Sequence, residues 1–411
     1  MRDAVSAAKV AEWVPVCADG LRRAVAGRPG FVESGPRLIG PTKLLVLQGT
    51  GFCNIDCRYC YLPNRSERGE MSVETVRAVI DRLLDDSLLK GTLLVNWHAG
   101  EPLVLRPAFY EERIPLFDRL VERGIEVTHS LQTNGMLVSD AYCELFKRYD
   151  IKVGVSVDGP AFIHDAQRVT RNGQGTHAAT LAGMRRLAQH EIGFNAICVL
   201  SDASVRHPRE IYEFFATNRV RAVAFNIEEI EGANRTSSIQ SSGYDDRYSR
   251  FLSAFWELVE RDGRRMHVRE FDDAIGRITD DKPRRNSQTD PFVNLTVGWR
   301  GDFSSYCPEL LGNSFPGYPT FTLGNVHETG FRESASSPLF CRMQAEISAG
   351  VAACAAQCDY FDVCGGGNPS NKISENGSFN STATQNCRNR IQATCEFVLG
   401  KVEARIAAAR P

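Results

Sequence analysis

The chain has 411 residues, and its 48 lysines and arginines nearly balance its 50 aspartates and glutamates, giving a formal net charge of -2. This balance excludes a nucleic-acid binder that relies on bulk positive charge. With 43% hydrophobic and 24% charged residues, the composition also excludes disorder over most of the chain. The length predicts about two or three domains.

No membrane-spanning or export segment is expected. The longest apolar stretch, residues 43–48, is far shorter than the roughly 20 residues that span a bilayer. Charged residues interrupt the segment 1–16, which therefore lacks the apolar region of a signal peptide. We expect a cytoplasmic protein without a membrane partner, whose 13 cysteines stay reduced and serve metal binding or catalysis.

Short apolar runs alternate with amphipathic stretches between residues 43 and 229, which predicts successive βαβ units and a parallel sheet. Ser72 and Ser139 are the expected N-caps of two of the helices. Six βα units are too few for a closed eight-stranded barrel, so we predict a partial, open (β/α)6 barrel of the α/β class. The predicted strands are 43–48, 93–97, 126–132, 152–157, 194–200 and 222–227, and the predicted helices are 73–84, 108–123, 139–148, 177–190 and 208–218.

Further helices are expected at 246–261 and 271–278, followed by a polar linker at 279–290. A hairpin is then expected over 294–306, and after it a Cys-rich, Gly-rich, loop-dominated region that ends in a closing helix at 391–409. The expected domains are an N-terminal arm (1–40), the partial barrel (41–232), bridging helices and linker (233–291) and the Cys-rich domain (292–411).

Three cysteines stand directly after the first predicted strand, at the end of a barrel where such folds place their chemistry. Cys53, Cys57 and Cys60 form a Cys-x3-Cys-x2-Cys array in the segment FCNIDCRYCYL. A tetrahedral zinc site needs four ligands, and no fourth Cys or His is close in sequence. Three thiolates on a cubane of four irons leave one iron available to an exogenous molecule.

This spacing, with the aromatic Tyr59 before the last cysteine, resembles the radical S-adenosylmethionine (SAM) superfamily, whose front 4Fe-4S cluster chelates SAM. The segment WHAGEP after the second strand is similar to the family's Gly-Gly-Glu-Pro motif, with Ala99 in the first glycine position. The resemblance implies that Tyr59, Ala99, Gly100 and Glu101 lie at the SAM site, where the carboxylate would face the ammonium group of SAM.

Two further positions follow from related maturases, in which a strand-four Ser and a downstream Arg hold the ribose and carboxylate of SAM. By position these residues are Ser156 and Arg168, with Arg171 a competitor. Asn195 on the fifth strand is expected to face the barrel lumen. A purely structural role stays open for each of these residues.

The region beyond the linker is dense in cysteines, which indicates metal binding in a reducing compartment. Cys354, Cys358 and Cys364, followed by three glycines and then Cys387, supply four ligands. This arrangement resembles the SPASM extension of peptide-modifying radical SAM enzymes, which holds auxiliary 4Fe-4S clusters. Zinc on the same four cysteines stays an alternative, because spacing alone does not choose between zinc and iron.

The SPASM resemblance has two departures. The usual extension opens with Cys-x2-Cys, where this chain has a gap of three, and it carries a further cysteine where this chain has Asn368. A second auxiliary cluster has only Cys307 and Cys341 as expected ligands, with Cys395 an additional candidate, so it is incomplete, unusually ligated or absent. We therefore expect one or two auxiliary clusters.

Within the superfamily, the strings WHAGEPL, SVDGPAFIHDAQR, FNIEEIEG and CGGGNPSNK most resemble the maturases of glycine-rich-repeat peptides. Those enzymes belong to, or lie close to, the cyclophane synthases, which join an aromatic ring carbon to a β-carbon in a ribosomal precursor peptide. The resemblance implies oxidative modification of such a peptide, with an electron donor such as flavodoxin or ferredoxin.

Such a reaction needs a base for the released proton. Sulfatase maturases carry an Asp directly after the cysteine that matches Cys307, but this chain has Pro308 there, and Glu309 follows as the candidate catalytic base. Glu228, Glu229 and Glu231 stand near the end of the sixth strand, where one of them can instead contact peptide or SAM. A sulfatase or thioether maturase, and a non-catalytic redox-sensing iron-sulfur protein, stay as alternatives.

Overall fold

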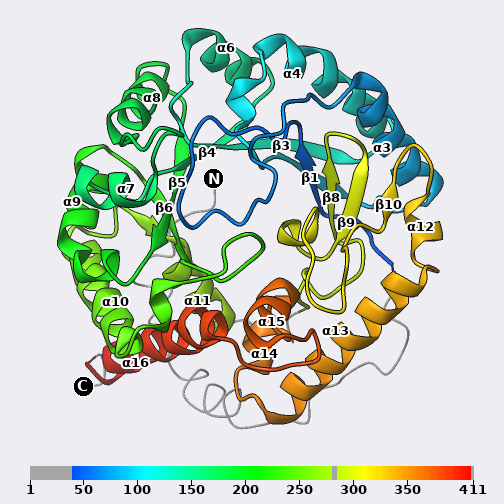
Figure 1. Ribbon diagram of the computed structural model, residues 1–411. Helices are drawn as coiled ribbons and strands as arrows, with labels where there is room; N and C mark the ends of the chain where they lie inside the picture. Colours follow the sequence, from blue (N-terminus) through cyan, green and yellow to red (C-terminus); the bar gives the residue numbers. More distant parts are fainter. Residues whose placement is uncertain (1–38, 280–284, 409–411) are drawn as a thin grey trace.

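The computed structural model describes residues 39–279 and 285–408, which are organised by one ten-stranded sheet (Figure 1). Nearly all of the expected N-terminal arm and part of the expected linker lie outside these residues. The strand order is β10-β9-β8-β1-β2-β3-β4-β5-β6-β7. The strands are β1 Leu44–Gln48, β2 Thr92–Trp97, β3 Glu126–Thr133, β4 Lys152–Ser156, β5 Phe194–Leu200, β6 Ala222–Ile227, β7 His267–Val268, β8 Asn294–Gly298, β9 Asp302–Ser305 and β10 Gly324–Asn325.

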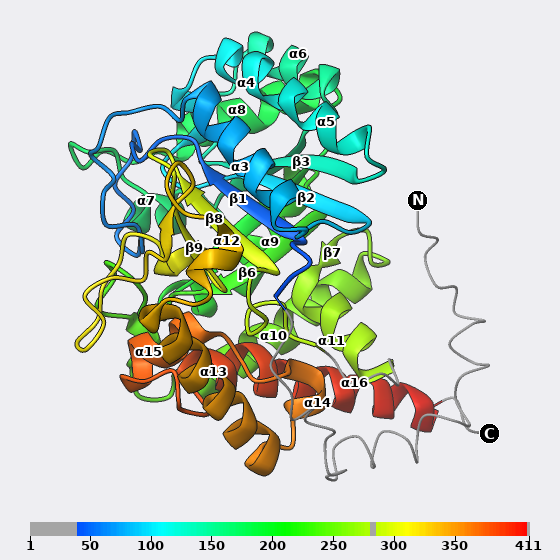
Figure 2. The same ribbon diagram turned by 90° about the vertical axis from the view of Figure 1, so that its right-hand side faces the viewer.

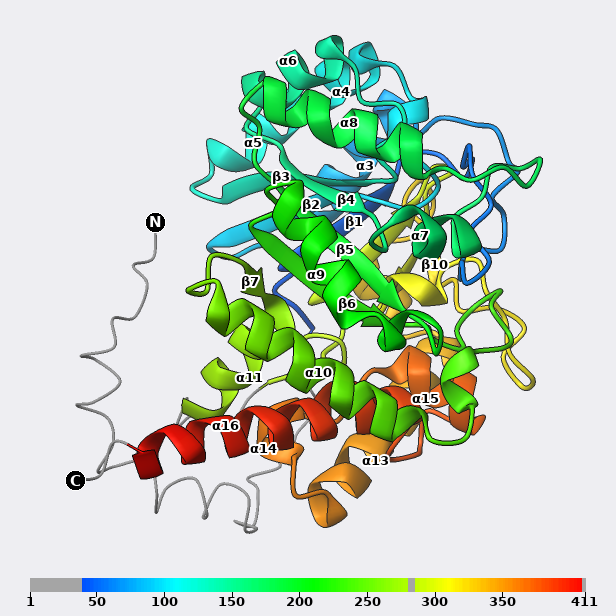
Figure 3. The same ribbon diagram turned by 90° about the vertical axis from the view of Figure 1, so that its left-hand side faces the viewer.

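The first six strands are parallel neighbours in chain order, and helices cover their outer face (Figures 1 and 3). The predicted partial α/β barrel is therefore confirmed, with each predicted strand within two residues of its observed bounds. The outer helices are α3 Val73–Asp85, α4 Pro107–Arg113, α5 Asp118–Val121, α6 Asp140–Arg148, α7 Ala161–Gln167, α8 His177–Gln189 and α9 Pro208–Thr217.

Local sequence explains where these elements begin and which face they bury. The Ser72 hydroxyl accepts a hydrogen bond from the Thr75 backbone N–H at 3.0 Å, as expected for the N-cap of α3. In β5, Ala196, Cys198 and Leu200 are fully buried, whereas the alternate residues are partly or fully exposed. Because successive side chains point to opposite faces of a strand, the alternate residues face the barrel interior.

One predicted helix, 108–123, is broken in the structure. It consists of α4, a 3-10 turn at Ile114–Phe117 and the short helix α5. Pro115 lies in the middle of the turn, where it cannot donate a backbone hydrogen bond and its ring crowds the preceding turn. The apolar periodicity continues across Pro115, but the α-helical conformation is interrupted there.

The predicted hairpin forms, with antiparallel β8 and β9 joined by a turn at Gly301. The structure adds that β8 also pairs in parallel with β1 over five residues of each strand. The hairpin therefore extends the barrel sheet and covers the edge of β1, which would otherwise present unpaired backbone groups. A hairpin signal in sequence does not specify the edge on which the hairpin docks, so this contact was not predicted.

The remaining helices form a layer below the barrel sheet in Figure 2. The long helix α13 was not predicted, because glycines and cysteines suggested loops, but its buried residues recur every three or four positions in a helical stripe. Helix α16 packs along α10 and α11 and closes the layer, as predicted (Figure 3). The helices of this layer are α10 Tyr244–Arg261, α11 Arg269–Thr279, α13 Pro338–Gln357, α14 Phe361–Cys364, α15 Pro369–Asn376 and α16 Thr394–Ala408, whereas the short helix α12 Phe331–Ser334 lies level with the sheet in Figure 2.

Within the described ranges, none of the helices combines the length and the apolar composition that crossing a bilayer requires.

Two helical glycines give a matched test of the packing. A Cβ on Gly183 in α8 would lie 1.9 Å from the carbonyl oxygen of Gly135, whereas a Cβ on Gly276 in α11 would meet nothing within 4 Å. We expect Gly183→Ala to lower the free energy of unfolding by about 1–3 kcal/mol through overpacking. Gly276→Ala should raise it by roughly 0.5–1 kcal/mol, because alanine favours the helix. Chemical denaturation measures both changes, and equal effects of the two variants would contradict the described packing of α8.

Candidate cluster and cofactor site

The loop that follows β1 carries Cys53, Cys57 and Cys60 at the carboxyl end of the barrel strands (Figure 1). A segment after α7 holds this loop in place. The backbone N–H of Asp56 donates to the Val169 carbonyl at 2.7 Å, and Arg171 Nε donates to the Cys53 carbonyl at 2.8 Å. These two hydrogen bonds hold the cysteine loop at the carboxyl end of the barrel strands.

The three thiols lie close together and are largely removed from water. Burial, followed by the charge of Glu101, raises the pKa of Cys53 to about 12, and burial raises the pKa of Cys57 to about 11. Cys57 and Cys60 add to the upward shift at Cys53. A positively charged metal centre favours three thiolates in this setting, since metal binding displaces the thiol protons. The donor set therefore fits an iron-sulfur cluster.

The turn after β2 packs directly against the cysteine loop. Gly100 has φ +63°, and a Cβ there would lie 2.6 Å from the Phe52 carbonyl oxygen and 2.7 Å from that of Thr50. Ala99 also has a positive φ, +79°, which explains why the family motif has glycine at this position. The backbone N–H of Glu101 donates to the Phe52 carbonyl at 2.8 Å and fastens the turn to the loop.

The Glu101 carboxylate is buried and joins the ends of β2 and β3. It accepts hydrogen bonds from the Thr133 hydroxyl at 2.6 Å and from the backbone N–H groups of Asn134 at 2.8 Å and Leu103 at 2.9 Å. Burial raises the pKa of Glu101, and these three hydrogen bonds oppose the shift. Glu101 therefore connects the turn after β2 to the end of β3, and its contact with SAM stays a prediction.

Asp158 is a buried centre of the site that the sequence did not single out, because the string SVDGP is also an ordinary turn composition. Its carboxylate accepts hydrogen bonds from the Tyr59 hydroxyl, from Arg168 Nε at 3.1 Å and from the backbone N–H of Val199 at 3.0 Å. Arg168 also places Nη1 3.8 Å from Cys57 Sγ. Asp158 therefore positions both Tyr59 and Arg168 at the cysteine loop, and their contacts with SAM stay predictions.

The other residues predicted for SAM lie at different heights in the barrel. Ser156 ends β4, and its hydroxyl accepts a hydrogen bond from Gln132 Nε2 at 2.8 Å. Asn195 is exposed near the start of β5, where it pairs with Gly154, so it is remote from the carboxyl end of the sheet. Contacts of Ser156 and Asn195 with SAM stay predictions.

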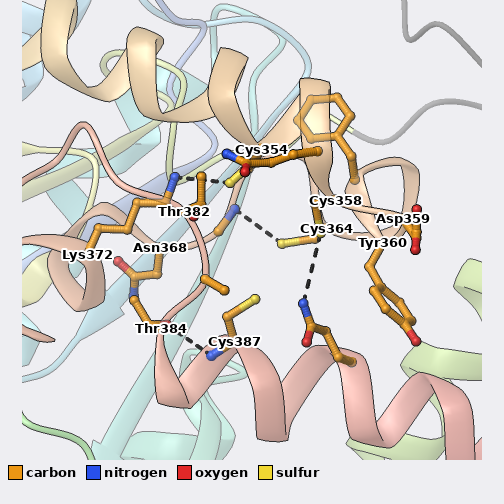
Figure 4. Close-up of a pocket in the computed structure, with 16 residues that line it drawn as sticks. Cys354, Cys358, Asp359, Tyr360, Cys364, Asn368, Lys372, Thr382, Thr384 and Cys387 are labelled. Carbon is orange, nitrogen blue, oxygen red and sulfur yellow. Dashed lines mark hydrogen bonds between the residues drawn. The ribbon is translucent and has the colours of Figure 1, made fainter. Parts of the chain in front are cut away.

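A second cysteine site lies in the layer below the barrel. Figure 4 shows Cys354, Cys358, Cys364 and Cys387 around one cavity of ≈ 350 Å³. Burial, followed by the charges of the other three thiols, raises the pKa of Cys387 to about 12. A cavity of this size has room for a polynuclear cluster, whereas four thiols on one zinc ion would lie closer together.

Hydrogen-bond donors surround this cavity. The backbone N–H of Gly367 lies 3.1 Å from Cys364 Sγ, and Gln392 Nε2 lies 4.0 Å from Cys358 Sγ. Lys372 is 3% exposed, and its Nζ donates to Cys354 Sγ at 3.4 Å and to the Gly350 carbonyl at 3.1 Å. Donors and a buried ammonium compensate the negative charge of four thiolates, so the site suits a reducible cluster.

Three glutamates meet where the barrel contacts the Cys-rich domain. Burial, together with repulsion from Glu229, raises the pKa of Glu309 to about 7. Burial and the nearby charges of Glu309 and Glu229 raise the pKa of Glu231 well above its ordinary value. Asn371 Nδ2 donates to Glu229 at 3.0 Å and to Glu231 at 3.3 Å. The predicted base Glu309 thus belongs to a buried carboxyl cluster that can hold a proton near neutral pH.

The structure does not bring together the cysteines proposed for a second auxiliary cluster. Cys307 is buried, and its Sγ donates to Asn368 Oδ1 at 2.9 Å. Cys341 is exposed at the start of α13, where its Sγ contacts the Ala335 carbonyl. The two thiols have separate surroundings in this structure, and their ligation of a second cluster stays a prediction.

Comparisons with known proteins identify the family of this chain. The model of the Radical SAM superfamily matches residues 47–215. An uncharacterized protein of Synechocystis sp. is 39% identical over 89% of this chain and 93% of its own length. The chain belongs to the radical SAM superfamily. The superfamily cofactors are a 4Fe-4S cluster and SAM, and the residues that would hold the cluster are Cys53, Cys57 and Cys60.

A serine-type anaerobic sulfatase-maturating enzyme of Klebsiella aerogenes is 31% identical over 54% of this radical SAM chain and 55% of its own length. Among solved structures, anSMEcpe with bound AdoMet and a peptide has a TM-score of 0.72 at 20% identity, covering 90% of this chain and all of its own. Streptococcus suis SuiB bound to precursor peptide SuiA has a TM-score of 0.58 at 14% identity, covering 86% and 77%. At these identities the structural likeness shows the fold.

The turn at Gly100 offers a test of the loop geometry. We expect Gly100→Ala to prevent loading of the front cluster, because the new Cβ would press on the carbonyls of Phe52 and Thr50. Ala99→Gly is the matched control, which should load normally and relieve strain at a positive φ. Iron analysis and the visible absorption of the anaerobically reconstituted protein measure both. Normal loading of Gly100→Ala would show that this close approach is not required.

Lys372 offers a test of the second site. Lys372→Met keeps the length of the side chain and removes its charge, so the reduced, more negative cluster loses a stabilising partner. We expect the auxiliary reduction potential to fall by roughly 60 mV, the equivalent of about 1.4 kcal/mol for one electron. Redox titration followed by EPR measures the shift, and Lys90→Met, at an exposed position, is the control. An unchanged potential in Lys372→Met would contradict the placement of a cluster beside Lys372.

Proposed function

We propose that this enzyme oxidatively modifies a ribosomally synthesised precursor peptide by joining an aromatic ring carbon to the β-carbon of a nearby residue. The observation that carries the proposal is the position of α15. Its residue Lys372 borders the four-cysteine cavity, and the neighbouring Asn371 contacts the carboxyl cluster of Glu229 and Glu231. One short helix therefore lies between a site suited to accept an electron and a site suited to accept a proton.

Ring closure of this kind requires both acceptors. The β-carbon loses a hydrogen atom and bonds to the arene, and the arene then loses one proton and one electron. When bound, SAM and the clusters supply the 5'-deoxyadenosyl radical and accept the final electron. Glu309 is the candidate for the proton, because its Oε2 is buried without a hydrogen-bond partner in the described structure and its pKa is raised to about 7.

Peptide substrates are also supported by the similar proteins, since anSMEcpe and SuiB were both solved with a bound peptide. The named Klebsiella relative favours sulfatase maturation as a second candidate. Pro308 stands against that candidate, because the resemblance implies an Asp at this position in sulfatase maturases. Electron transfer from a flavodoxin or ferredoxin, in the cytoplasm, completes the proposal.

Mass spectrometry distinguishes the candidates. The enzyme is co-expressed anaerobically with a candidate precursor peptide that carries aromatic residues near repeated Gly, Asn or Arg, and the peptide is isolated. The proposal predicts the loss of two hydrogens and tandem fragments that stay linked between an aromatic residue and its neighbour. An aldehyde that reacts with a hydrazide probe would identify formylglycine instead and overturn the cyclophane assignment.

Glu309→Gln tests the proton acceptor. The amide keeps the size of the side chain but cannot take the proton, so we expect cross-linked product to fall about 100-fold or more. Cleavage of SAM to 5'-deoxyadenosine should continue, because the variant leaves the front loop intact. Glu328→Gln, at an exposed position of the same domain, is the matched control and should behave as wild type. Full cross-linking by Glu309→Gln would show that Glu309 is not the proton acceptor.

A further inference from the structure

We infer that this chain holds one auxiliary cluster and not two, and that Cys307 is a free thiol fastened by Asn368 to the start of α15. The inference concerns cluster number and does not depend on which peptide is modified. It rests on the partners of Cys307, on the positions of the other cysteines and on the charges around the thiol.

Cys307 donates a hydrogen bond to the side-chain amide of Asn368, at the position where a cluster would need a second cysteine. Asn368 Oδ1 accepts from Cys307 Sγ at 2.9 Å and from the backbone N–H of Ser370 at 2.8 Å. The same side chain therefore caps α15 and ties it to the end of β9. Because an iron-sulfur cubane of this kind takes four cysteine ligands, an asparagine in place of a cysteine leaves its binding site short of donors.

The other spare thiols belong to different surroundings. Cys341 is exposed on α13, and Cys395 is buried on α16 beside Arg277 and Cys364. The partner of Cys307 Sγ is Asn368, whereas Cys341 Sγ contacts the Ala335 carbonyl. In the four-cysteine cavity, by contrast, the four thiols line one common space. The hydrogen-bond partner of Cys307 is therefore an amide and not another thiol.

Charge also disfavours a cluster at Cys307. Glu309 stands two residues away, and Glu231 and Glu229 face the same region from the end of β6. Arg390 is a neighbouring cation, on the π-helical turn Cys387–Ala393. A cluster ligated by thiolates carries net negative charge, which ionised carboxylates here would repel and Arg390 would offset only in part. The four-cysteine cavity has such a cation in the buried Lys372.

Native mass spectrometry of the full chain, reconstituted anaerobically, counts the clusters directly. We expect two 4Fe-4S units per chain, about eight irons in total. Cys307→Ser should keep both units, because its thiol binds no iron, whereas Cys358→Ala should keep one. A third unit in the wild-type protein that disappears in Cys307→Ser would overturn the inference.

A second variant keeps the test decisive if Cys307→Ser does not fold. Asn368→Ala leaves Cys307 in place and removes only its hydrogen-bond partner. Two units should remain in Asn368→Ala, together with a lower melting temperature, because α15 loses its cap. A third unit in the wild-type protein that is absent from Asn368→Ala would show that this pair supports a cluster and would contradict the inference.

Discussion

The site depends on one electrostatic constraint: three neighbouring and partly buried thiols on one loop are stabilised together as thiolates by a positively charged metal centre. Burial and mutual repulsion hold the protons on Cys53 and Cys57 in the protein alone. The rest of the barrel mouth serves to keep the loop in that position. Gly100 lets the turn after β2 pack against the cysteine loop, and Glu101 hydrogen-bonds to β3 through Thr133. Asp158 holds Arg168 beside Cys57.

A second constraint links the barrel to the Cys-rich domain. Helix α15 contacts the four-cysteine cavity through Lys372 and the glutamates through Asn371, while Asn368 at its start contacts Cys307. One short helix therefore couples a cluster site, a carboxyl cluster and a single thiol. The proposed cross-linking reaction needs an electron acceptor and a proton acceptor, and the two sites joined by α15 are the candidates for these roles.

The sequence predicted what is local. The spacing of Cys53, Cys57 and Cys60, the alternation of the strands and the caps Ser72 and Ser139 are all readable within a few residues. It did not predict contacts between distant segments. Three such contacts are decided by the packing of the whole fold. β8 pairs with β1, Asp158 binds Arg168 in the interior, and Glu231 lies near Glu309. The break at Pro115 was missed because apolar periodicity outweighed the backbone effect of proline.

The most direct test of the account is Mössbauer spectroscopy of the iron-57 protein with and without SAM. The account predicts that SAM changes the signal of one iron in the front cluster, because three cysteines leave one iron open to the ligand. The change should be absent in Cys57→Ala. A spectrum that SAM leaves unaltered, with the front cluster fully loaded, would contradict the central claim.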